Sequence, residues 1–209
     1  MQTKIYLIRH SIPERNIDYD SVSEDFQIFD KKRVLSAEGE LMAQKYSHID
    51  ELNNIDVAIS SDYARTMATI KYVAKNNNIA IKINSGFGER NFGVKNRDDI
   101  PDDYWDMQEN NHNFKLSGGE SFNETQERMY QSLMEVIEKY RGKRIAIASH
   151  GSSMEMLFDK WCDVVIENEY KNVYYKGKLV YVDNLETPDL FELLFEDDEL
   201  KSITRISIN

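Results

Sequence analysis

The segment that most constrains the fold is a short apolar run over residues 4–11, which ends in Arg9, His10 and a serine. A run of this length, rich in aliphatic residues, is typical of a buried strand in a parallel sheet. The same pattern returns at residues 144–149, which are followed directly by His150. The carboxyl ends of parallel strands meet at one edge of a sheet, where open α/β folds place their sites. If the two strands are neighbours, the two imidazoles face each other across one crevice.

Strand patterns and helix patterns alternate along the rest of the chain. The expected strands cover residues 56–60, 79–83, 178–182, 190–195 and 202–207. The expected helices cover residues 36–53, 61–75, 121–140 and 152–162. Strands that alternate with helices predict a parallel sheet covered by helices. We expect one domain over residues 1–209, an α/β fold with a three-layer α/β/α sandwich. Its central sheet is mostly parallel, with an antiparallel C-terminal edge hairpin and a polar insertion at about 95–117.

Several helix ends carry local signals. Ser36 is an expected N-cap, and Ser61 with Asp62 would supply the cap and a first-turn acid for the next helix. Ser121 and Glu124 have the spacing of a capping box, and Gly142 follows the end of that helix. The segment 11–32 reads as a long loop with a short helix near Phe26 and Phe29, and a second short helix is plausible over residues 102–110.

Composition and net charge limit which partners and which compartment are expected. The chain has 37 acidic and 26 basic residues, a net charge of −11, which disfavours nucleic acid and anionic membranes as partners. No apolar run approaches a membrane span, and no secretory signal pattern opens the sequence, so the expected compartment is the cytoplasm. The single cysteine, Cys162, excludes an internal disulfide and is expected to be a buried thiol.

Five candidate residues fall on connections that leave the carboxyl ends of strands. They are Arg9, His10, Arg65, Glu89 and His150. Two imidazoles, two guanidinium groups and one carboxyl group suit phosphoryl transfer through a histidine. One neutral imidazole attacks phosphorus, the cations hold the phosphoryl oxygens, and the carboxyl group protonates the departing oxygen. This chemistry requires no metal and no cofactor.

The chain resembles the histidine phosphatase superfamily, which contains phosphoglycerate mutases and many phosphomonoesterases. The similarity extends from residue 4 to about residue 155, with its motifs in the family's order. The matching elements are Leu7-Ile8-Arg9-His10, Asn16, Ser60 to Thr69 around Arg65, Glu89 with Gly93, Gly118-Gly119-Glu120-Ser121 and Ser149-His150-Gly151. Ser11 stands where the family usually has glycine.

The resemblance implies a role for each matching residue. His10 would be the nucleophile that becomes phosphohistidine, Arg9, Arg65 and His150 the phosphate clamp, and Glu89 the proton donor and later the base that activates water. The same comparison places further substrate contacts in the surrounding loops. Those contacts would come from Asn16, Ser11, Gly151 and the backbone N–H of Ser152 at a helix start.

Several alternatives stay open on sequence grounds. Glu120 and Asp62 compete with Glu89 for the acid, and Arg65 could instead be a surface residue paired with Asp62. His48 and His112 are expected to be exposed bystanders. The acidic run over residues 98–103 is expected to be a solvated face, or else a lid that repels polyanions.

The expected function is hydrolysis of a small phosphate monoester. One alternative is a phosphoglycerate-type mutase, which in this family has a longer and more basic cover after the acid loop. Here the insertion is short and acidic, with Lys95, Arg97 and Lys115 as its basic residues. The other alternative is a module that binds a phosphate ligand without turnover. The sequence does not indicate the substrate or the oligomeric state.

Overall fold

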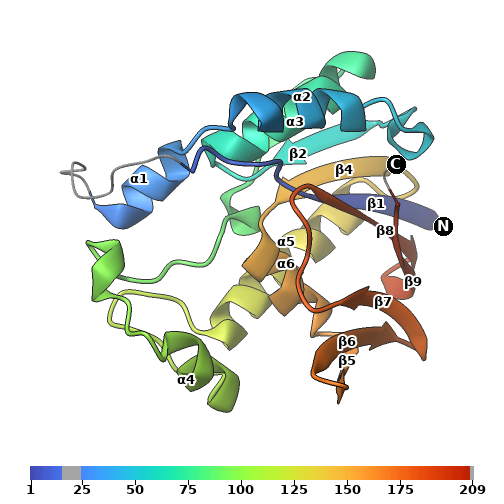
Figure 1. Cartoon of the computed structure of the whole chain (residues 1–209). Helices are drawn as coiled ribbons and strands as arrows, with labels where there is room; N and C mark the ends of the chain where they lie inside the picture. Colours follow the sequence, from blue (N-terminus) through green and yellow to red (C-terminus); the bar gives the residue numbers. More distant parts are fainter. Residues whose placement is uncertain (16–24, 208–209) are drawn as a thin grey trace.

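The computed structural model describes residues 1–15 and 25–207, and its centre is a six-stranded sheet (Figure 1). The strand order is β3-β2-β4-β1-β8-β9. The first four of these strands run parallel, and β8 and β9 extend the sheet as an antiparallel edge hairpin. The strands are β1 (Gln2–Arg9), β2 (Val57–Ser60), β3 (Ile81–Ile83), β4 (Arg144–Ser149), β8 (Asp189–Glu196) and β9 (Glu199–Arg205). The expected fold class is confirmed.

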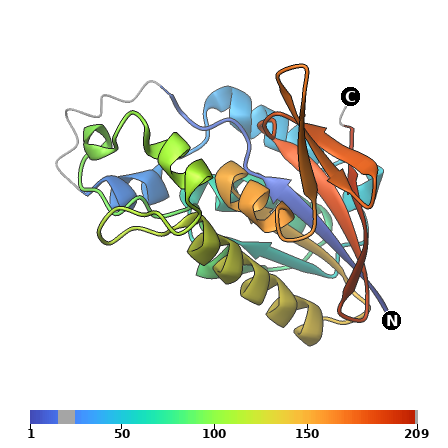
Figure 2. The ribbon, with the colours of Figure 1, turned by 90° about the horizontal axis from the view of Figure 1, so that it is seen from below.

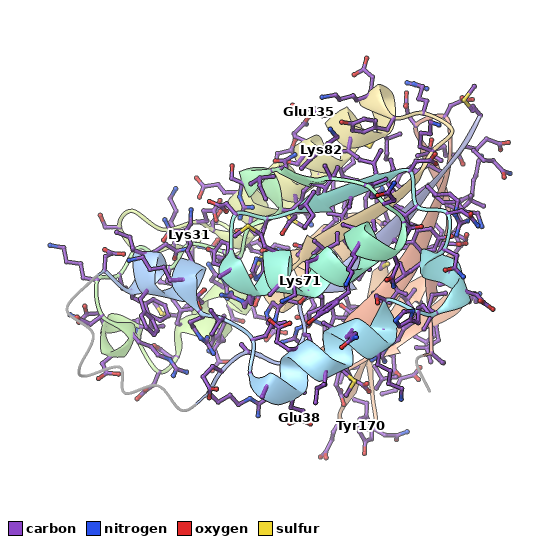
Figure 3. All side chains as sticks on the ribbon, turned by 90° about the horizontal axis from the view of Figure 1, so that it is seen from above. Lys31, Glu38, Lys71, Lys82, Glu135 and Tyr170 are labelled. Carbon is purple, nitrogen blue, oxygen red and sulfur yellow. The ribbon has the colours of Figure 1, made fainter. Side chains whose placement is uncertain are left out.

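Helices cover both faces of this sheet. One face packs against α2 (Ala37–Tyr46) and α3 (Ala64–Asn76), seen from outside in Figure 3, where α2 carries Glu38 and α3 carries Lys71. The other face packs against α5 (Phe122–Lys139) and α6 (Gly151–Phe158), seen in Figure 2. None of the described helices is both long and apolar enough to cross a membrane.

The sheet separates two hydrophobic cores because successive side chains of a strand point to opposite faces. In β1, Ile5 and Leu7 join the core under α5 and α6, whereas Tyr6 and Ile8 join the core under α3. All four side chains are at most 2% exposed. The strand is therefore buried on both sides, which explains its nearly continuous apolar sequence.

A second, smaller sheet lies on the α6 side of the molecule. It has the order β5-β6-β7 and is antiparallel, with β5 (Asp163–Glu167), β6 (Tyr170–Tyr175) and β7 (Lys178–Val182). Val173, Val180 and Tyr181 bury this sheet against the core beneath α6. The strand over residues 178–182 was expected, whereas β5 and β6 were not predicted. Every residue of β5 is exposed, so this strand carries no alternation between buried and exposed positions.

Two short helices extend beyond the carboxyl ends of the parallel strands. They are α1 (Phe26–Lys32) and α4 (Tyr104–Asn110), and Figure 1 shows both at the same end of the sheet. Both match expected short helices. The insertion that contains α4 is not exposed throughout, since Tyr104 and Gln108 are buried within it.

The expected cap of α3 is wrong. The helix begins at Ala64 with Tyr63 as its N-cap, and no side chain caps it. The hydroxyl of Ser61 instead lies 2.9 Å from Nε2 of His150, and Asp62 forms a 2.7 Å ion pair with Lys31. Both polar groups are used by tertiary contacts, which local sequence does not reveal.

Two helices are shorter than expected. The helix after Ser36 ends at Tyr46, and a 3-10 turn at Asp50–Leu52 replaces its last part. The helix after His150 ends at Phe158, so Cys162 lies outside it. Cys162 is nevertheless buried, as expected, and burial raises the pKa of its thiol to about 12.

The capping box of α5 is present as expected and supports a prediction about stability. The Ser121 side chain accepts from the Glu124 N–H at 3.2 Å, and Glu124 accepts from the Ser121 N–H at 3.0 Å. Ser121→Ala should lower the free energy of unfolding by about 0.5–2 kcal/mol, because a helix-terminal N–H loses its partner. Urea denaturation measures this change. Ser117→Ala, at an exposed loop position, is the matched control. Equal denaturation midpoints for the two variants would contradict the assignment.

Candidate active site

The pairing of β1 with β4 brings the two histidines together. Arg9 is the partner of Ser149 in the parallel register, and the His10 N–H donates to the Ser149 carbonyl oxygen at 3.0 Å. The ring centroids of His10 and His150 lie 5.3 Å apart, edge to face. His10 is 6% exposed and His150 is fully buried. The two strand-end histidines therefore face each other, as the neighbouring strands were expected to place them.

The hydrogen bond of His10 determines which ring nitrogen is available. Its Nδ1 lies 2.7 Å from the backbone carbonyl oxygen of Ser11. A carbonyl oxygen only accepts hydrogen bonds, so Nδ1 carries the proton of the neutral ring. The lone pair is then on Nε2, the nitrogen from which a histidine could attack.

The imidazole of His150 is held by a hydrogen bond and by an aromatic contact. Nε2 of His150 lies 2.9 Å from the Ser61 hydroxyl, which in turn lies 2.7 Å from the Thr66 hydroxyl. The Tyr63 ring packs edge-on against the imidazole, with centroids 4.4 Å apart. Nδ1 of His150 is buried and has no hydrogen-bond partner among the described residues. A buried polar atom without a partner costs about 1–3 kcal/mol, and a ligand oxygen would relieve that cost.

Arg9 is fixed against the start of α6. Its guanidinium donates to the Leu185 carbonyl oxygen, and its Nε is buried without a partner among the described residues. A Cβ on Gly151 would lie 2.8 Å from the guanidinium carbon, so a side chain at this position would displace the Arg9 guanidinium. The glycine after His150 thus makes room for the arginine before His10.

Arg65 is buried and held by α1. It is 3% exposed, and its guanidinium donates to the Asp30 carbonyl at 2.6 Å and to the Asp30 carboxylate at 3.0 Å. The guanidinium also lies over the Tyr63 ring, 4.7 Å from its centroid. The alternative of a surface residue paired with Asp62 is wrong. Asp30 was not singled out in the sequence, because nothing local connects it to a residue 35 positions away.

Glu89 contacts the first turn of α6 through one oxygen. Its Oε1 accepts from the Ser153 N–H at 3.2 Å and from its neighbour Arg90 N–H at 3.0 Å, and it lies 3.0 Å from the Ser153 hydroxyl. No hydrogen bond from the described residues reaches Oε2. One carboxyl oxygen is therefore fixed, and the other is available for proton transfer.

The two competing carboxylates are used elsewhere. Glu120 binds both Nε and NH2 of Arg128, at 2.7 and 2.8 Å, and accepts from the Asn91 N–H at 3.0 Å. Arg128 also donates to the Gly88 carbonyl, and so holds the loop that carries Glu89. Asp62 is paired with Lys31. Of the three candidates weighed from sequence, Glu89 is the one that forms no ion pair with a cation among the described residues.

Burial and neighbouring cations keep both imidazoles neutral. Burial, together with the positive charges of Arg65 and Arg9, lowers the pKa of His10 well below the ordinary value of 6.5. Burial and the charge of Arg65 lower the pKa of His150 in the same way. Loss of solvation disfavours the charged form of a histidine, and nearby positive charge adds to that effect. Both rings are therefore neutral at pH 7 in the free protein.

The expected substrate contacts fall into three groups. Gly151 and Ser152 form the first turn of α6, whose N–H groups have no acceptor within the helix. Ser11 donates its hydroxyl to the Gly39 carbonyl at 2.8 Å and its N–H to Thr69 at 2.9 Å, so its polar groups face the fold. Asn16 lies outside the described residues. All four contacts stay predictions.

The remaining histidines lie elsewhere. His48 is exposed after the end of α2, and His112 is half-buried and stacks on Phe122, with centroids 4.1 Å apart. Among residues 1–15 and 25–207, no cluster of three or more histidine, cysteine or acidic side chains could hold a metal ion.

Known proteins resemble this chain in sequence and in fold. A probable phosphoglycerate mutase of Salmonella choleraesuis is 28% identical over 161 residues, which cover 74% of this chain and 72% of that protein. A mycobacterial glucosyl-3-phosphoglycerate phosphatase superposes with a TM-score of 0.70 at 13% identity, covering 98% and 97% of the two chains. A putative alpha-ribazole-5'-P phosphatase from Escherichia coli superposes with a TM-score of 0.66 at 17% identity, covering 99% of each chain.

The family itself follows from the sequence match. The model of the histidine phosphatase superfamily (branch 1) matches residues 5–182, most of the chain and every described element that carries a candidate residue. The enzyme class expected from the motifs, a histidine phosphatase, is confirmed at this level. The protein belongs to the histidine phosphatase superfamily.

Proposed function

We propose that the protein hydrolyses a small phosphate monoester through a phosphohistidine on His10. The observation that carries this proposal is the fixed tautomer of His10, whose free Nε2 belongs to a ring 5.3 Å from that of His150. Nucleophilic catalysis by histidine needs a neutral ring with an exposed lone pair, and the Ser11 carbonyl provides that state.

The first chemical step transfers the phosphoryl group to His10. Nε2 attacks phosphorus, the bond to the ester oxygen breaks, and Glu89 donates a proton to the departing oxygen. In the second step Glu89 takes a proton from water, the water oxygen attacks phosphorus, and the bond to Nε2 breaks. Inorganic phosphate leaves, and His10 and Glu89 return to their starting states.

Cations and helix N–H groups would stabilise the phosphoryl group in both steps. Within the described part of the chain, Arg9 and His150 each have a buried nitrogen without a partner, and Arg65 lies close enough to lower the pKa of both imidazoles. The first turn of α6 adds backbone donors at the positive end of its dipole. Such preorganised donors are typically the largest contribution to catalysis of group transfer.

A mutase is the second candidate, and the observation that favours it is the sequence similarity to a probable phosphoglycerate mutase of Salmonella choleraesuis. A mutase must hold the departing alcohol until it is rephosphorylated. The insertion here carries the exposed acidic residues Asp98, Asp99 and Asp102, which do not favour retention of an anionic ester. The expected cytoplasmic location, the independence from metal and cofactor, and the lack of a nucleic-acid partner stay predictions from the sequence.

The covalent intermediate gives the first functional prediction. The wild type, mixed with a ³²P-labelled phosphomonoester and quenched in alkaline detergent, should carry a protein label that is stable to alkali and labile to acid. His10→Ala should carry no label and should not turn over. The control is His48→Ala, which removes an exposed imidazole and should label like the wild type.

The outcomes separate the candidate functions. Turnover without a label on the wild type, or a label on His10→Ala, would contradict the assigned nucleophile. A label that passes to a second monoester rather than to water identifies a mutase. Tight phosphate binding with neither label nor turnover identifies a binding module.

The protonation state of His10 gives the second functional prediction. Because burial and the charges of Arg65 and Arg9 lower its pKa well below 6.5, the neutral ring should persist as the pH falls through 6.5. Long-range ¹H–¹⁵N NMR of the free protein should show the Nδ1–H tautomer from pH 8 to pH 6. A histidine-containing model peptide in the same buffer, with the ordinary imidazole pKa of about 6.5, is the reference. Titration of His10 together with the model peptide would contradict the assignment.

A further inference from the structure

A cavity of about 530 Å³ has walls from the insertion, from α6 and from the small sheet. Its lining includes Glu155, which accepts from the N–H of Leu185, the residue whose carbonyl oxygen accepts from Arg9. The cavity therefore lies near Arg9 of the candidate active site. Ligand pockets usually measure about 300–1,000 Å³, so there is room for an alcohol much larger than the phosphoryl group.

Three carboxylates face this cavity. They belong to Glu109 of α4, Glu155 of α6 and Asp159 just after α6. Glu155 accepts from the Leu185 N–H at 3.2 Å, and burial raises its pKa. An ionised carboxylate accepts hydrogen bonds and a neutral carboxyl group can also donate one, so this wall suits ligand hydroxyl groups, and its ionised carboxylates repel ligand carboxylates.

The cations of the cavity do not balance these charges. Arg90 is 2% exposed, its guanidinium donates to the Gln108 side chain, and it lies 4.5 Å from the Trp105 ring centroid. The Arg90 guanidinium is therefore engaged by residues of the insertion, and it is too buried to bind an anionic ligand readily. Lys171 of β6 is the other cation in the lining. Two cations against three carboxylates leave the cavity with a formal net charge of −1.

An aromatic surface completes the lining. Trp105 is 52% exposed although it packs against Phe92 and Tyr104, so part of its indole faces the open space. Tyr181 and Phe122 contribute further aromatic surface. Aromatic walls with a few hydrogen-bonding groups are typical of sites that hold small organic ligands. Weak C–H contacts with aromatic rings are available to a sugar ring, which also carries hydroxyl groups at its edge.

From these features we propose that the leaving alcohol is neutral and polyhydroxylated, of at least monosaccharide size, with its ring against Trp105 and its hydroxyl groups donating to Glu155 and Asp159. Carboxylated esters such as 3-phosphoglycerate and phosphoserine are then poor substrates. This inference rests on the proposed phosphatase function and specifies its substrate class.

The test is a comparison of kcat/KM among phosphate esters. The panel contains glucose 6-phosphate, glucose 1-phosphate, 3-phosphoglycerate, phosphoserine, AMP and phenyl phosphate as the reference ester. At least one sugar phosphate should exceed both carboxylated esters by about tenfold or more, since the site's hydroxyl acceptors discriminate between them. Asp159→Asn should reduce the ratio of sugar phosphate to 3-phosphoglycerate by about threefold or more, because it removes repulsion of the ligand carboxylate.

The control variant is Asp163→Asn. It removes one negative charge from an exposed position on β5 outside the cavity, and it should leave that ratio unchanged. One contrary result is turnover of phenyl phosphate together with equal kcat/KM values for the sugar phosphates and for 3-phosphoglycerate or phosphoserine. That result would overturn the substrate class but would not contradict the phosphatase function. A kcat/KM for AMP above the values for both sugar phosphates would also overturn the substrate class. So would a ratio of sugar phosphate to 3-phosphoglycerate that does not change in Asp159→Asn. No turnover of any ester and no phosphohistidine would remove the function and this inference together.

Discussion

The site depends on the parallel pairing of β1 with β4. This register places Arg9 beside Ser149, and the hydrogen bond from the His10 N–H to the Ser149 carbonyl continues it by one residue. A shift of one residue would turn every side chain of β1 to the opposite face. Because β1 is buried on both faces, the two hydrophobic cores fix that register. Packing in the middle of the sheet thus sets the position of two imidazoles at its end.

The electrostatics of the site are local and oppose the charge of the whole chain. A protein with a net charge of −11 concentrates Arg9 and Arg65 beside two buried imidazoles. Arg65 is compensated from outside by Asp30, and Glu89 is oriented by N–H groups at the start of α6. Arg65 and Glu89 therefore each have a fixed hydrogen-bond partner within the protein. That arrangement holds the donors in place before a phosphate arrives, which is what electrostatic preorganisation requires.

Local patterns predicted the parts of this structure that depend on local physics. The buried strands, the capping box at Ser121 and the edge hairpin follow from periodicity and side-chain chemistry, and the site residues follow from strand ends and family motifs. The partners of those residues were not predictable in the same way. Asp30, Ser153 and Arg128 reach the site across long sequence separations.

The cap of α3 was predicted wrongly and strand β5 was not predicted, and both failures come from contacts between distant parts of the chain. Ser61 has the local features of a cap, yet its hydroxyl serves His150 from a different part of the chain. The exposed strand β5 is stabilised by pairing with β6 rather than by burial, so its sequence lacks the usual alternation. Tertiary contacts override local preference in both cases.

The most direct test of the account is a crystal structure with orthovanadate, which takes the geometry of a phosphoryl group in transfer. The account predicts vanadium bonded to Nε2 of His10, with Nδ1 of His150 and the guanidinium groups of Arg9 and Arg65 within hydrogen-bond distance of its oxygens. Vanadate bonded to His150, or bound away from the histidine pair, would contradict it.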